Sequence, residues 1–281
     1  MWGEHIMKKL ISIAVALGML ALTGCAAQEE KSTEVYVFAA ASLSRPMEDL
    51  EASYEQSHPG VDIIVSTDSS GVLMTQIEEG ATCDIFFSAG AKQMNQLVEE
   101  GLVDEPSVVN ILGNSLVVIG SVSMGTAVEG LDTLGNGQII AICDATVPAG
   151  RYTRQALVNN GSIELPEGGL EAITTADLME ALGVEVSEQS NVSKALTAVA
   201  EGSCDAGTCY YSDTYGYEDD IVILETVPSD LTGNIIYPAG RVTNANASQE
   251  SAQAADDFFT YLQSDEAMEV FSVYYFEPAG N

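Results

Sequence analysis

The feature that most constrains the fold is an alternation of short β-rich runs with longer amphipathic segments, which begins near Glu34. Runs rich in Val, Ile, Phe and Tyr predict strands, and apolar residues spaced by three and four predict helices. The expected strands are residues 34–40, 61–66, 84–88, 115–119, 138–143, 206–211 and 221–225, with an extended segment at 235–242. The expected helices are residues 43–57, 71–79, 91–100, 148–159, 191–201 and 248–264, followed by a short helix that ends at 274.

This alternation predicts an α/β fold, because strands that alternate with helices form parallel sheets covered on both faces. The strands outnumber those of one small sheet, and no repeat or low-complexity linker divides the chain. Two α/β lobes with a cleft between them are therefore the simplest arrangement. In open parallel sheets the ligand lies beyond the carboxyl ends of the strands, where helices begin. We therefore expect the functional residues at strand-to-helix turns.

The N-terminal segment has a different character. Lys8 and Lys9 precede an apolar stretch at residues 10–22. This stretch predicts a secretory signal rather than a membrane span, because a span needs about 20 apolar residues. The run Leu-Thr-Gly-Cys that ends at Cys25 resembles a bacterial lipobox, in which cleavage before the cysteine frees it for lipidation. An ordinary cleaved signal is the alternative, and Met7 is an alternative start.

We therefore expect residues 1–24 to be a signal peptide and residues 25–33 a tether that is lipid-anchored through Cys25. Such an anchor holds a soluble domain at a membrane surface without spanning the membrane. The expected location is the extracellular face of the cell membrane or the periplasm.

The charge of the chain limits its partners. It carries 42 Asp and Glu against 9 Lys and Arg, a formal net charge of −33. Because nucleic-acid affinity depends on cationic contacts to phosphate, this balance argues against a nucleic-acid partner. The apolar fraction of 46% with 18% charged residues is typical of a globular chain with a sizeable core.

Catalytic and metal-binding side chains are scarce. His5 falls in the predicted signal, and the other histidine, His58, precedes Pro59 in an expected loop. The four cysteines after the anchor match no zinc-binding spacing; they are Cys83, Cys143, Cys204 and Cys209. Two of them lie in expected strands and predict buried thiols, whereas a Cys204–Cys209 disulfide stays open. No nucleophile elbow or phosphate-loop motif is present, so we expect neither an enzyme nor a cofactor.

Two turns in the first part of the chain combine hydroxyls with free amides. Ser42 follows a strand within the run Ala-Ala-Ala-Ser-Leu-Ser, and Ser70 lies beside Ser69 and Gly71 at another helix start. The amides of a first helical turn and the helix dipole favour an anion. The alternatives are that Ser42 is only a helix N-cap and that the second turn is a plain Ser-Gly loop.

A third turn lies at residues 146–152. Pro148 suits the first position of a helix, because its missing amide is one that the helix could not use. Ala149 and Gly150 then offer unshielded amides. We expect Arg151 to pair with a surface carboxylate rather than with a ligand.

A fourth turn, at residues 189–196, is a capped helix start at which Val192 can contribute its backbone amide. Tyr210, in the expected strand at residues 206–211, could reach the same point with its hydroxyl. A buried core position with a satisfied hydroxyl is the alternative for Tyr210.

The four turns together predict an anion cleft built from neutral donors. Such a site prefers a fully deprotonated anion, because a hydroxyl on the ligand would find no acceptor and remain unpaired. Molybdate, tungstate and sulfate meet this condition at neutral pH, whereas hydrogen phosphate does not.

The order and spacing of six stretches carry a family resemblance: FAAASL at 38–43, residues 70–77, DIFFSA at 84–89, GNSLVV at 113–118, VPAG at 147–150, and Tyr-Pro at 237–238. Over nearly its whole mature length the chain resembles the molybdate-binding proteins of bacterial ABC importers. This resemblance implies a two-lobed type II periplasmic-binding-protein fold, in which each lobe is a mixed, mostly parallel sheet flanked by helices. It also implies a monomer that closes on its ligand and docks on a membrane permease.

The resemblance also implies a set of ligand-binding residues. Ser42 and Ser70 would bind the oxyanion from the first lobe, and Ala149, Val192 and Tyr210 from the second, with no direct ligand to the metal. The expected lobes are residues 34–114 with 232–281, and residues 115–231. The sequence departs from the family at residues 143–146, which are one residue shorter, and at residues 193–194, where an arginine is common.

Other functions stay open at this point. The ligand could be sulfate, thiosulfate or, given the tyrosines near Tyr210, ferric ion. An enzyme on the same fold and a sensor or adhesin with a protein partner are the alternatives from other functional classes.

Overall fold

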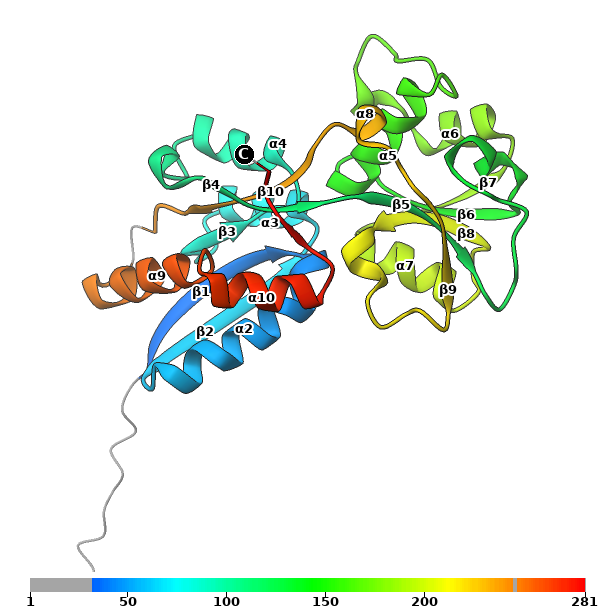
Figure 1. Cartoon of the computed structure of the whole chain (residues 1–281). Coiled ribbons are helices and arrows are strands. Elements are labelled where there is room, and N and C mark those ends of the chain that lie inside the picture. The colour runs from blue at the N-terminus through cyan, green and yellow to red at the C-terminus, as the bar shows by residue number, and fades with distance from the viewer. Residues whose placement is uncertain (1–31, 245–246, 281) are drawn as a thin grey trace, which may run out of the picture. The chain divides into compact units, whose positions relative to one another are not determined.

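The computed structural model describes residues 32–244 and 247–280, and its strands form two separate sheets (Figure 1). The predicted signal peptide, Cys25 and the tether up to residue 31 lie outside the described residues. None of the helices in the described part of the chain is long and apolar enough to cross a membrane.

The sheet of the first lobe has the strand order β11-β4-β10-β3-β1-β2. Its strands are β1 (Thr33–Ala40), β2 (Val61–Asp68), β3 (Ile85–Phe87), β4 (Val109–Asn114), β10 (Ile235–Arg241) and β11 (Glu277–Pro278). Its helices are α2 (Ser44–Ser57), α3 (Ser70–Glu78), α4 (Ala91–Glu99), α9 (Gln249–Tyr261) and α10 (Asp265–Val273).

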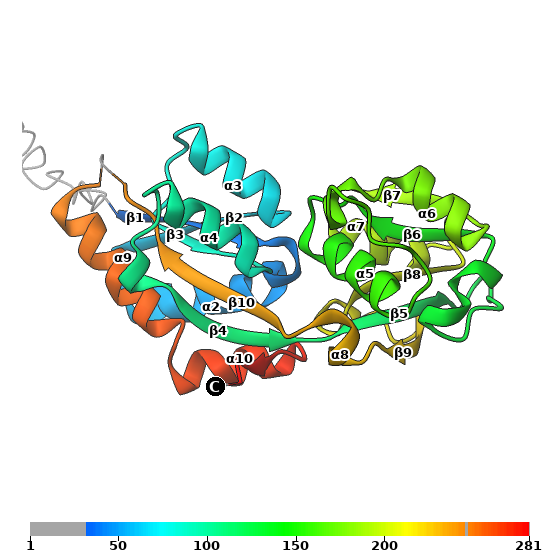
Figure 2. The same ribbon diagram turned by 90° about the horizontal axis from the view of Figure 1, so that it is seen from above.

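Side chains alternate in direction along β1, so the hydrophobic core of this lobe has two layers, one on each face of the sheet. Val35 and Val37 point to one face and pack in a cluster with Leu50 of α2 and Phe258 of α9. Phe38 points to the other face, where it packs with Leu73 of α3 and with side chains of α4. This is the period-two pattern of a strand that is buried on both sides. Figure 2 shows α3 and α4 on one face of the sheet and α2 and α9 on the other.

The sheet of the second lobe has the order β7-β6-β8-β5-β9. Its strands are β5 (Leu116–Ser121), β6 (Ile139–Cys143), β7 (Glu185–Gln189), β8 (Ala206–Tyr210) and β9 (Ile221–Thr226). Its helices are α5 (Pro148–Asn159), α6 (Thr175–Leu182), α7 (Val192–Ala200) and α8 (Ser229–Thr232). Helix α7 covers one face of the sheet, and α5 and α6 cover the other (Figure 1).

The chain passes between the two sheets twice. It leaves the first sheet at the end of β4 and enters the second with β5, separated only by Ser115, and it returns through α8 into β10. Both sheets are mixed, as expected, but antiparallel pairs are more frequent than the sequence suggested. The antiparallel pairs involve β4 and β10 in the first sheet and β5 in the second. These strands lie where the chain crosses between the sheets, and they run antiparallel to their neighbours.

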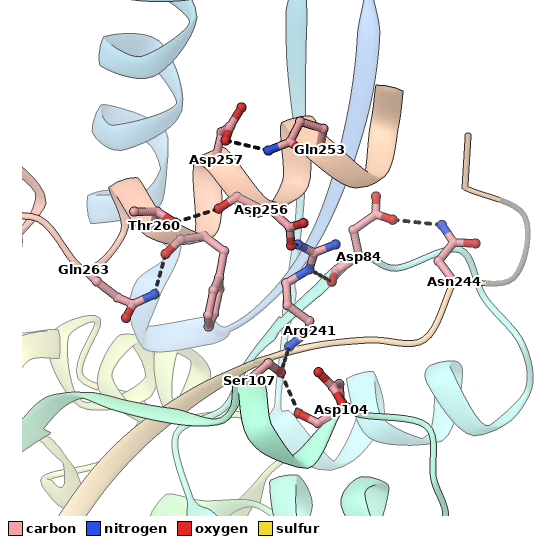
Figure 3. A network of polar contacts seen from close by, with 11 residues as sticks. Asp84, Asp104, Ser107, Arg241, Asn244, Gln253, Asp256, Asp257, Thr260 and Gln263 are labelled. Atoms are coloured by element: carbon pink, nitrogen blue, oxygen red, sulfur yellow. Dashed lines mark hydrogen bonds and ion pairs between the residues drawn. The ribbon is translucent and has the colours of Figure 1, made fainter. Parts of the chain in front are cut away.

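A polar network fixes the end of the returning strand in the first lobe (Figure 3). Arg241 donates from Nε to the carbonyl oxygen of Asp84 at 3.1 Å and forms an ion pair with Asp256 of α9. Its backbone amide donates to Ser107 Oγ at 2.8 Å. The Asp84 carboxylate also accepts from the backbone amide of Tyr36 at 2.9 Å, so the network joins β10, β1 and α9.

The predicted elements are present with small shifts at their ends, and the structure adds β4, α6, β7, α8 and β11. The cysteine prediction is confirmed for Cys143 and Cys209, which are buried in β6 and β8. The possible Cys204–Cys209 disulfide is wrong, since both thiols are free. Extended chain from Ala206 to Cys209 already spans about 10 Å, whereas a disulfide needs Cα atoms within about 7 Å.

Candidate functional site

The structure brings all five predicted site residues to one cavity between the two lobes. The cavity has a volume of about 10 Å³ and is lined by eleven residues, none of which carries a charge: Ala40, Ala41, Ser42, Ser69, Ser70, Ala89, Val147, Pro148, Ala149, Val192 and Tyr210. This is room for about one water molecule.

Ser42 lies in the turn that follows β1. The turn is a short 3₁₀ helix, η1 (Ala41–Leu43), whose N-cap is Ala40. The alternative that Ser42 is only a helix cap is therefore wrong, because its hydroxyl makes no capping bond. Instead Ser42 Oγ lies 2.9 Å from the hydroxyl of Tyr237.

Ser70 is the first residue of α3, directly after β2 and its cap. The capping is done by Ser69, whose Oγ accepts from the amide of Val72 at 3.3 Å. This leaves Ser70 Oγ to accept from the backbone amide of Ala89 at 2.9 Å. Since one lone pair of Ser70 Oγ is used in this way, its own proton is available to a ligand in the cavity.

The amide of Ala149 lies in the first turn of α5, after Pro148. The turn is so tight that a Cβ on Gly150 would lie 2.1 Å from the carbonyl oxygen of Asp144 and 2.4 Å from that of Cys143. No residue with a side chain could adopt this backbone without a clash with main-chain atoms. Glycine at position 150 is therefore what allows the chain to present the amides of this turn.

Arg154 holds the same turn from behind. Its side chain is 1% exposed and donates to the carbonyl oxygens of Cys143, Gly150 and Ile173 at 2.8, 3.0 and 2.9 Å. It makes no ion pair with a carboxylate among the described residues. A buried guanidinium that binds carbonyl groups fixes the backbone around Ala149 and places a positive charge behind the turn.

Val192 begins α7, and its N-cap is Asn191, whose Oδ1 accepts from the amide of Lys194 at 3.0 Å. The first amides of a helix have no partner within the helix, so that of Val192 can serve a ligand. The ammonium group of Lys194 bonds to Ser190 Oγ at 2.8 Å, and Lys194 does not line the cavity.

Tyr210 ends β8, and its side chain is 1% exposed. Its hydroxyl lies 3.5 Å from the carbonyl oxygen of Ala89 in the first lobe, which is too long for a strong bond. The hydroxyl is therefore only weakly satisfied, and Tyr210 lines the cavity. Burial raises the pKa of Tyr210 well above its ordinary value, so Tyr210 remains a protonated donor.

The charged groups near the turns do not line the cavity. Arg151 pairs with Glu171 at 3.2 Å, as predicted for a surface contact. The neighbouring tyrosines Tyr211, Tyr215 and Tyr217 are also absent from the cavity wall. Within the described ranges no group of three or more His, Cys, Asp or Glu side chains could hold a metal ion.

Sequence reasoning missed three residues that support the site. Arg154 has the spacing of an ordinary helix residue, and nothing in the sequence marks it as buried. Tyr237 belongs to one of the matched stretches, but its role depends on a contact with Ser42 across 195 positions. Asn114 contacts Tyr237 across 123 positions.

A family model described as bacterial extracellular solute-binding protein matches residues 35–277. The chain belongs to this family. Its members are solute-binding proteins of transport systems rather than enzymes, and the two mixed sheets flanked by helices are their periplasmic-binding-protein fold.

Named relatives cover nearly the whole chain. The molybdate-binding protein ModA of Escherichia coli is 31% identical over 98% of this chain and 97% of its own length. YvgL of Bacillus subtilis, provisionally named an ABC transporter substrate-binding lipoprotein, is 30% identical over 96% of this chain and 98% of its own. A solved structure from Clostridium difficile is provisionally described as the substrate-binding domain of a molybdenum ABC transporter. It is 30% identical, with a TM-score of 0.63, and covers 89% of this solute-binding protein and 100% of that chain.

Proposed function

We propose that this solute-binding protein captures a tetrahedral oxyanion, molybdate or tungstate first, and delivers it to the permease of an ABC importer. The observation that carries the proposal is the wall of the cavity, on which hydroxyls and first-turn amides gather without any charged side chain. Ser42 and Ser70 would bind the anion from the first lobe. The amides of Ala149 and Val192 and the hydroxyl of Tyr210 would bind it from the second.

A wall of neutral donors selects the protonation state of the ligand. Each donor gains a charge-assisted hydrogen bond from a dianion that carries no proton. A ligand with a hydroxyl would have to leave that hydroxyl or one of the donors unpaired, which is unfavourable in a buried site. Molybdate, tungstate and sulfate meet the requirement, and the names of the relatives favour the first two over sulfate.

The acidic surface does not prevent anion binding. The net charge of −33 is spread over a long chain, and salt screens exposed charges beyond about 8 Å at physiological ionic strength. The nearest groups to the anion are neutral donors and helix N-termini, whose dipoles attract it.

We propose that residues 34–114 with 232–281 form one rigid lobe and residues 115–231 the other. The two passages of the chain, at the junction of β4 with β5 and before β10, would be the hinge. The ligand favours the closed arrangement because only there do donors from both lobes reach it.

We also propose that Cys25 carries the lipid anchor after removal of residues 1–24. The name of YvgL supports this part of the proposal. Replacing Cys25 with Ser in the full chain should release the protein from the membrane fraction, while incorporation of a labelled fatty acid is lost. A Cys83→Ser variant is the control, because that thiol is buried in the folded domain.

Isothermal titration with a panel of oxyanions tests the ligand class. We expect 1:1 binding of molybdate and tungstate, weaker binding of sulfate, and little or none of hydrogen phosphate. Clear binding of sulfate or phosphate without a signal from molybdate or tungstate would contradict the proposal. A coloured complex with ferric ion would point to the metal-binding alternative.

A further inference from the structure

Tyr237 lies behind the cavity and does not line it. Its side chain is fully buried in β10, the strand by which the chain returns to the first lobe. Its hydroxyl has two polar neighbours among the described residues. One is Ser42 Oγ at 2.9 Å, and the other is Asn114 Nδ2 at 3.2 Å.

The orientation of the Asn114 amide decides the direction of these bonds. Asn114 Oδ1 accepts from the backbone amides of Ser115 at 2.8 Å and Ser212 at 3.4 Å. Backbone amides can only donate, so the oxygen and nitrogen of Asn114 cannot be exchanged. The NH₂ group therefore faces Tyr237 and Ser212 Oγ, and it donates to both.

Tyr237 must then donate to Ser42. Its oxygen accepts from Asn114, and burial raises the pKa of Tyr237 well above its ordinary value, so the phenol keeps its proton. Ser42 Oγ is the one remaining polar neighbour in the described part of the chain. A buried donor without an acceptor is unfavourable, so the proton of Tyr237 points to Ser42.

The consequence is that Ser42 keeps its proton for the cavity. Tyr237 donates to one of the two lone pairs of Ser42 Oγ and cannot accept from it, so the hydrogen of Ser42 is not spent on Tyr237. The same holds for Ser70, whose oxygen accepts from the amide of Ala89 at 2.9 Å. Both serines of the first lobe thus keep their protons for a ligand, because the groups behind them only donate.

We infer that Tyr237, oriented by Asn114, is a positioning residue that determines specificity: because it donates to Ser42, it keeps the proton of Ser42 available to the ligand and so favours oxyanions without a proton over those that carry one. The inference rests on the proposed function of the cavity. It adds that rejection of protonated anions depends on a side chain that touches no ligand.

The experiment compares sulfate with hydrogen phosphate, two dianions of similar size that differ by one proton. Calorimetry is done at a mildly alkaline pH, at which phosphate is chiefly the monohydrogen dianion. In Tyr237→Phe no hydrogen-bond donor restricts the rotation of the Ser42 hydroxyl, so Ser42 can turn its proton away from the cavity and both lone pairs toward a ligand hydroxyl. We expect the preference for sulfate over hydrogen phosphate to narrow by about tenfold, the worth of roughly one hydrogen bond to a charged group.

Asn114→Asp is a second variant that acts in the same direction. A carboxylate at position 114 can keep the bonds from the amides of Ser115 and Ser212, but toward Tyr237 it accepts instead of donating. The chain of bonds would then reverse, and Ser42 would turn its proton away from the cavity. The added charge repels both dianions alike, so the ratio of their affinities still reports the reversal. This variant decides the question if Tyr237→Phe does not fold.

A double-variant cycle separates positioning from general support of the fold. If Tyr237 acts through Ser42, then adding Tyr237→Phe to Ser42→Ala should leave the anion ratio as it is in Ser42→Ala alone. Tyr261→Phe is the matched control. Tyr261 also has a buried hydroxyl, with no hydrogen-bond partner in the described ranges, and it does not line the cavity.

An unchanged sulfate-to-phosphate ratio in both Tyr237→Phe and Asn114→Asp would overturn the inference, as would independent effects of Tyr237 and Ser42 in the cycle. A different result would contradict the proposed function: the wild-type protein itself would bind none of the oxyanions. That result would also overturn the inference about Tyr237.

Discussion

The ammonium group of Lys92 lies 2.6 Å from the carboxylate of Glu171, and the two residues belong to different lobes. Lys92 is in α4, and Glu171 is in the short helix η4 (Leu170–Ala172). Nearby, Gln93 Nε2 donates to the carbonyl oxygen of Thr146 at 3.3 Å, again from the first lobe to the second. The lobes are therefore joined by polar contacts, which the proposed opening of the cleft would separate.

Removing the Lys92 ammonium should weaken ligand binding slightly and speed ligand release. The side chains of Lys92 and Glu171 are 50% and 34% exposed, and exposed ion pairs contribute about 0.2–1 kcal/mol. We expect Lys92→Met to reduce affinity by up to about fivefold, chiefly through faster dissociation in stopped-flow measurements. Arg151→Met is the control, because Arg151 pairs with the same carboxylate from within the second lobe. Equal effects of the two variants would show that the contact between the lobes has no special role.

Gly71→Ala should weaken binding while it leaves the fold intact or stabilises it. A Cβ at Gly71 in α3 would lie 3.2 Å from the carbonyl oxygen of Thr146 in the other lobe, a tight contact with main chain. The closed lobes would have to separate slightly, so we expect a severalfold loss of affinity. Alanine is a better helix former than glycine by up to about 1 kcal/mol, so the melting temperature without ligand should not fall. Glu78→Ala on the same helix should not change affinity, and a Gly71→Ala variant with unchanged affinity would contradict the prediction.

Tyr210→Phe should weaken binding of molybdate by roughly 1–3 kcal/mol, the cost of one lost donor to a charged ligand. The hydroxyl has only a long contact, 3.5 Å, to the carbonyl oxygen of Ala89. Stability without ligand should therefore change little, which separates a binding effect from a folding effect. Tyr261→Phe is again the matched control, and calorimetry is the measurement. An unchanged affinity would remove Tyr210 from the site.

Asp213 gives the stability of the fold a dependence on pH. Burial raises the pKa of Asp213 to about 7, although the backbone amide of Tyr210 at 3.0 Å and the charge of Arg45 act against the rise. Between about pH 4 and 7 the folded state keeps a proton that the unfolded carboxyl has lost, so stability falls as pH rises, by at most about 1.4 kcal/mol per unit. Above about pH 7 the carboxyl of Asp213 is ionised in both states and causes no further change in stability.

Comparison with Asp213→Asn isolates this effect from the many other carboxylates. Urea unfolding of both proteins between about pH 4 and 7 should show that the free energy of unfolding falls more steeply with pH in the wild type than in the variant. Parallel curves would contradict the assignment of the raised pKa to Asp213.

The order of the elements and the positions of the turns could be predicted because they depend on local patterns. Apolar runs with period two mark β1 and β6, and Pro148 marks the start of α5 to the residue. Strand β7 (Glu185–Gln189) was missed because it is short, polar and at a sheet edge, where little apolar surface is required.

The residues that support the candidate site could not be predicted, because their roles depend on contacts between distant parts of the chain. Ser42 and Ser70 are visible in the sequence as hydroxyls at helix starts. The groups that orient them are Tyr237, from the returning strand, and the amide of Ala89. Arg154 is an ordinary helix residue until the fold buries it against the carbonyl groups of the Ala149 turn.

The central claim is that a tetrahedral oxyanion is held between the lobes by neutral donors alone. Crystals grown with molybdate, measured at the molybdenum absorption edge, test it most directly, since the anomalous signal locates the metal atom. We predict one strong peak in the cavity, with oxygen atoms about 2.7–3.2 Å from the hydroxyls of Ser42, Ser70 and Tyr210 and the amides of Ala149 and Val192. A peak at another place, or charged side chains around the anion, would contradict the claim.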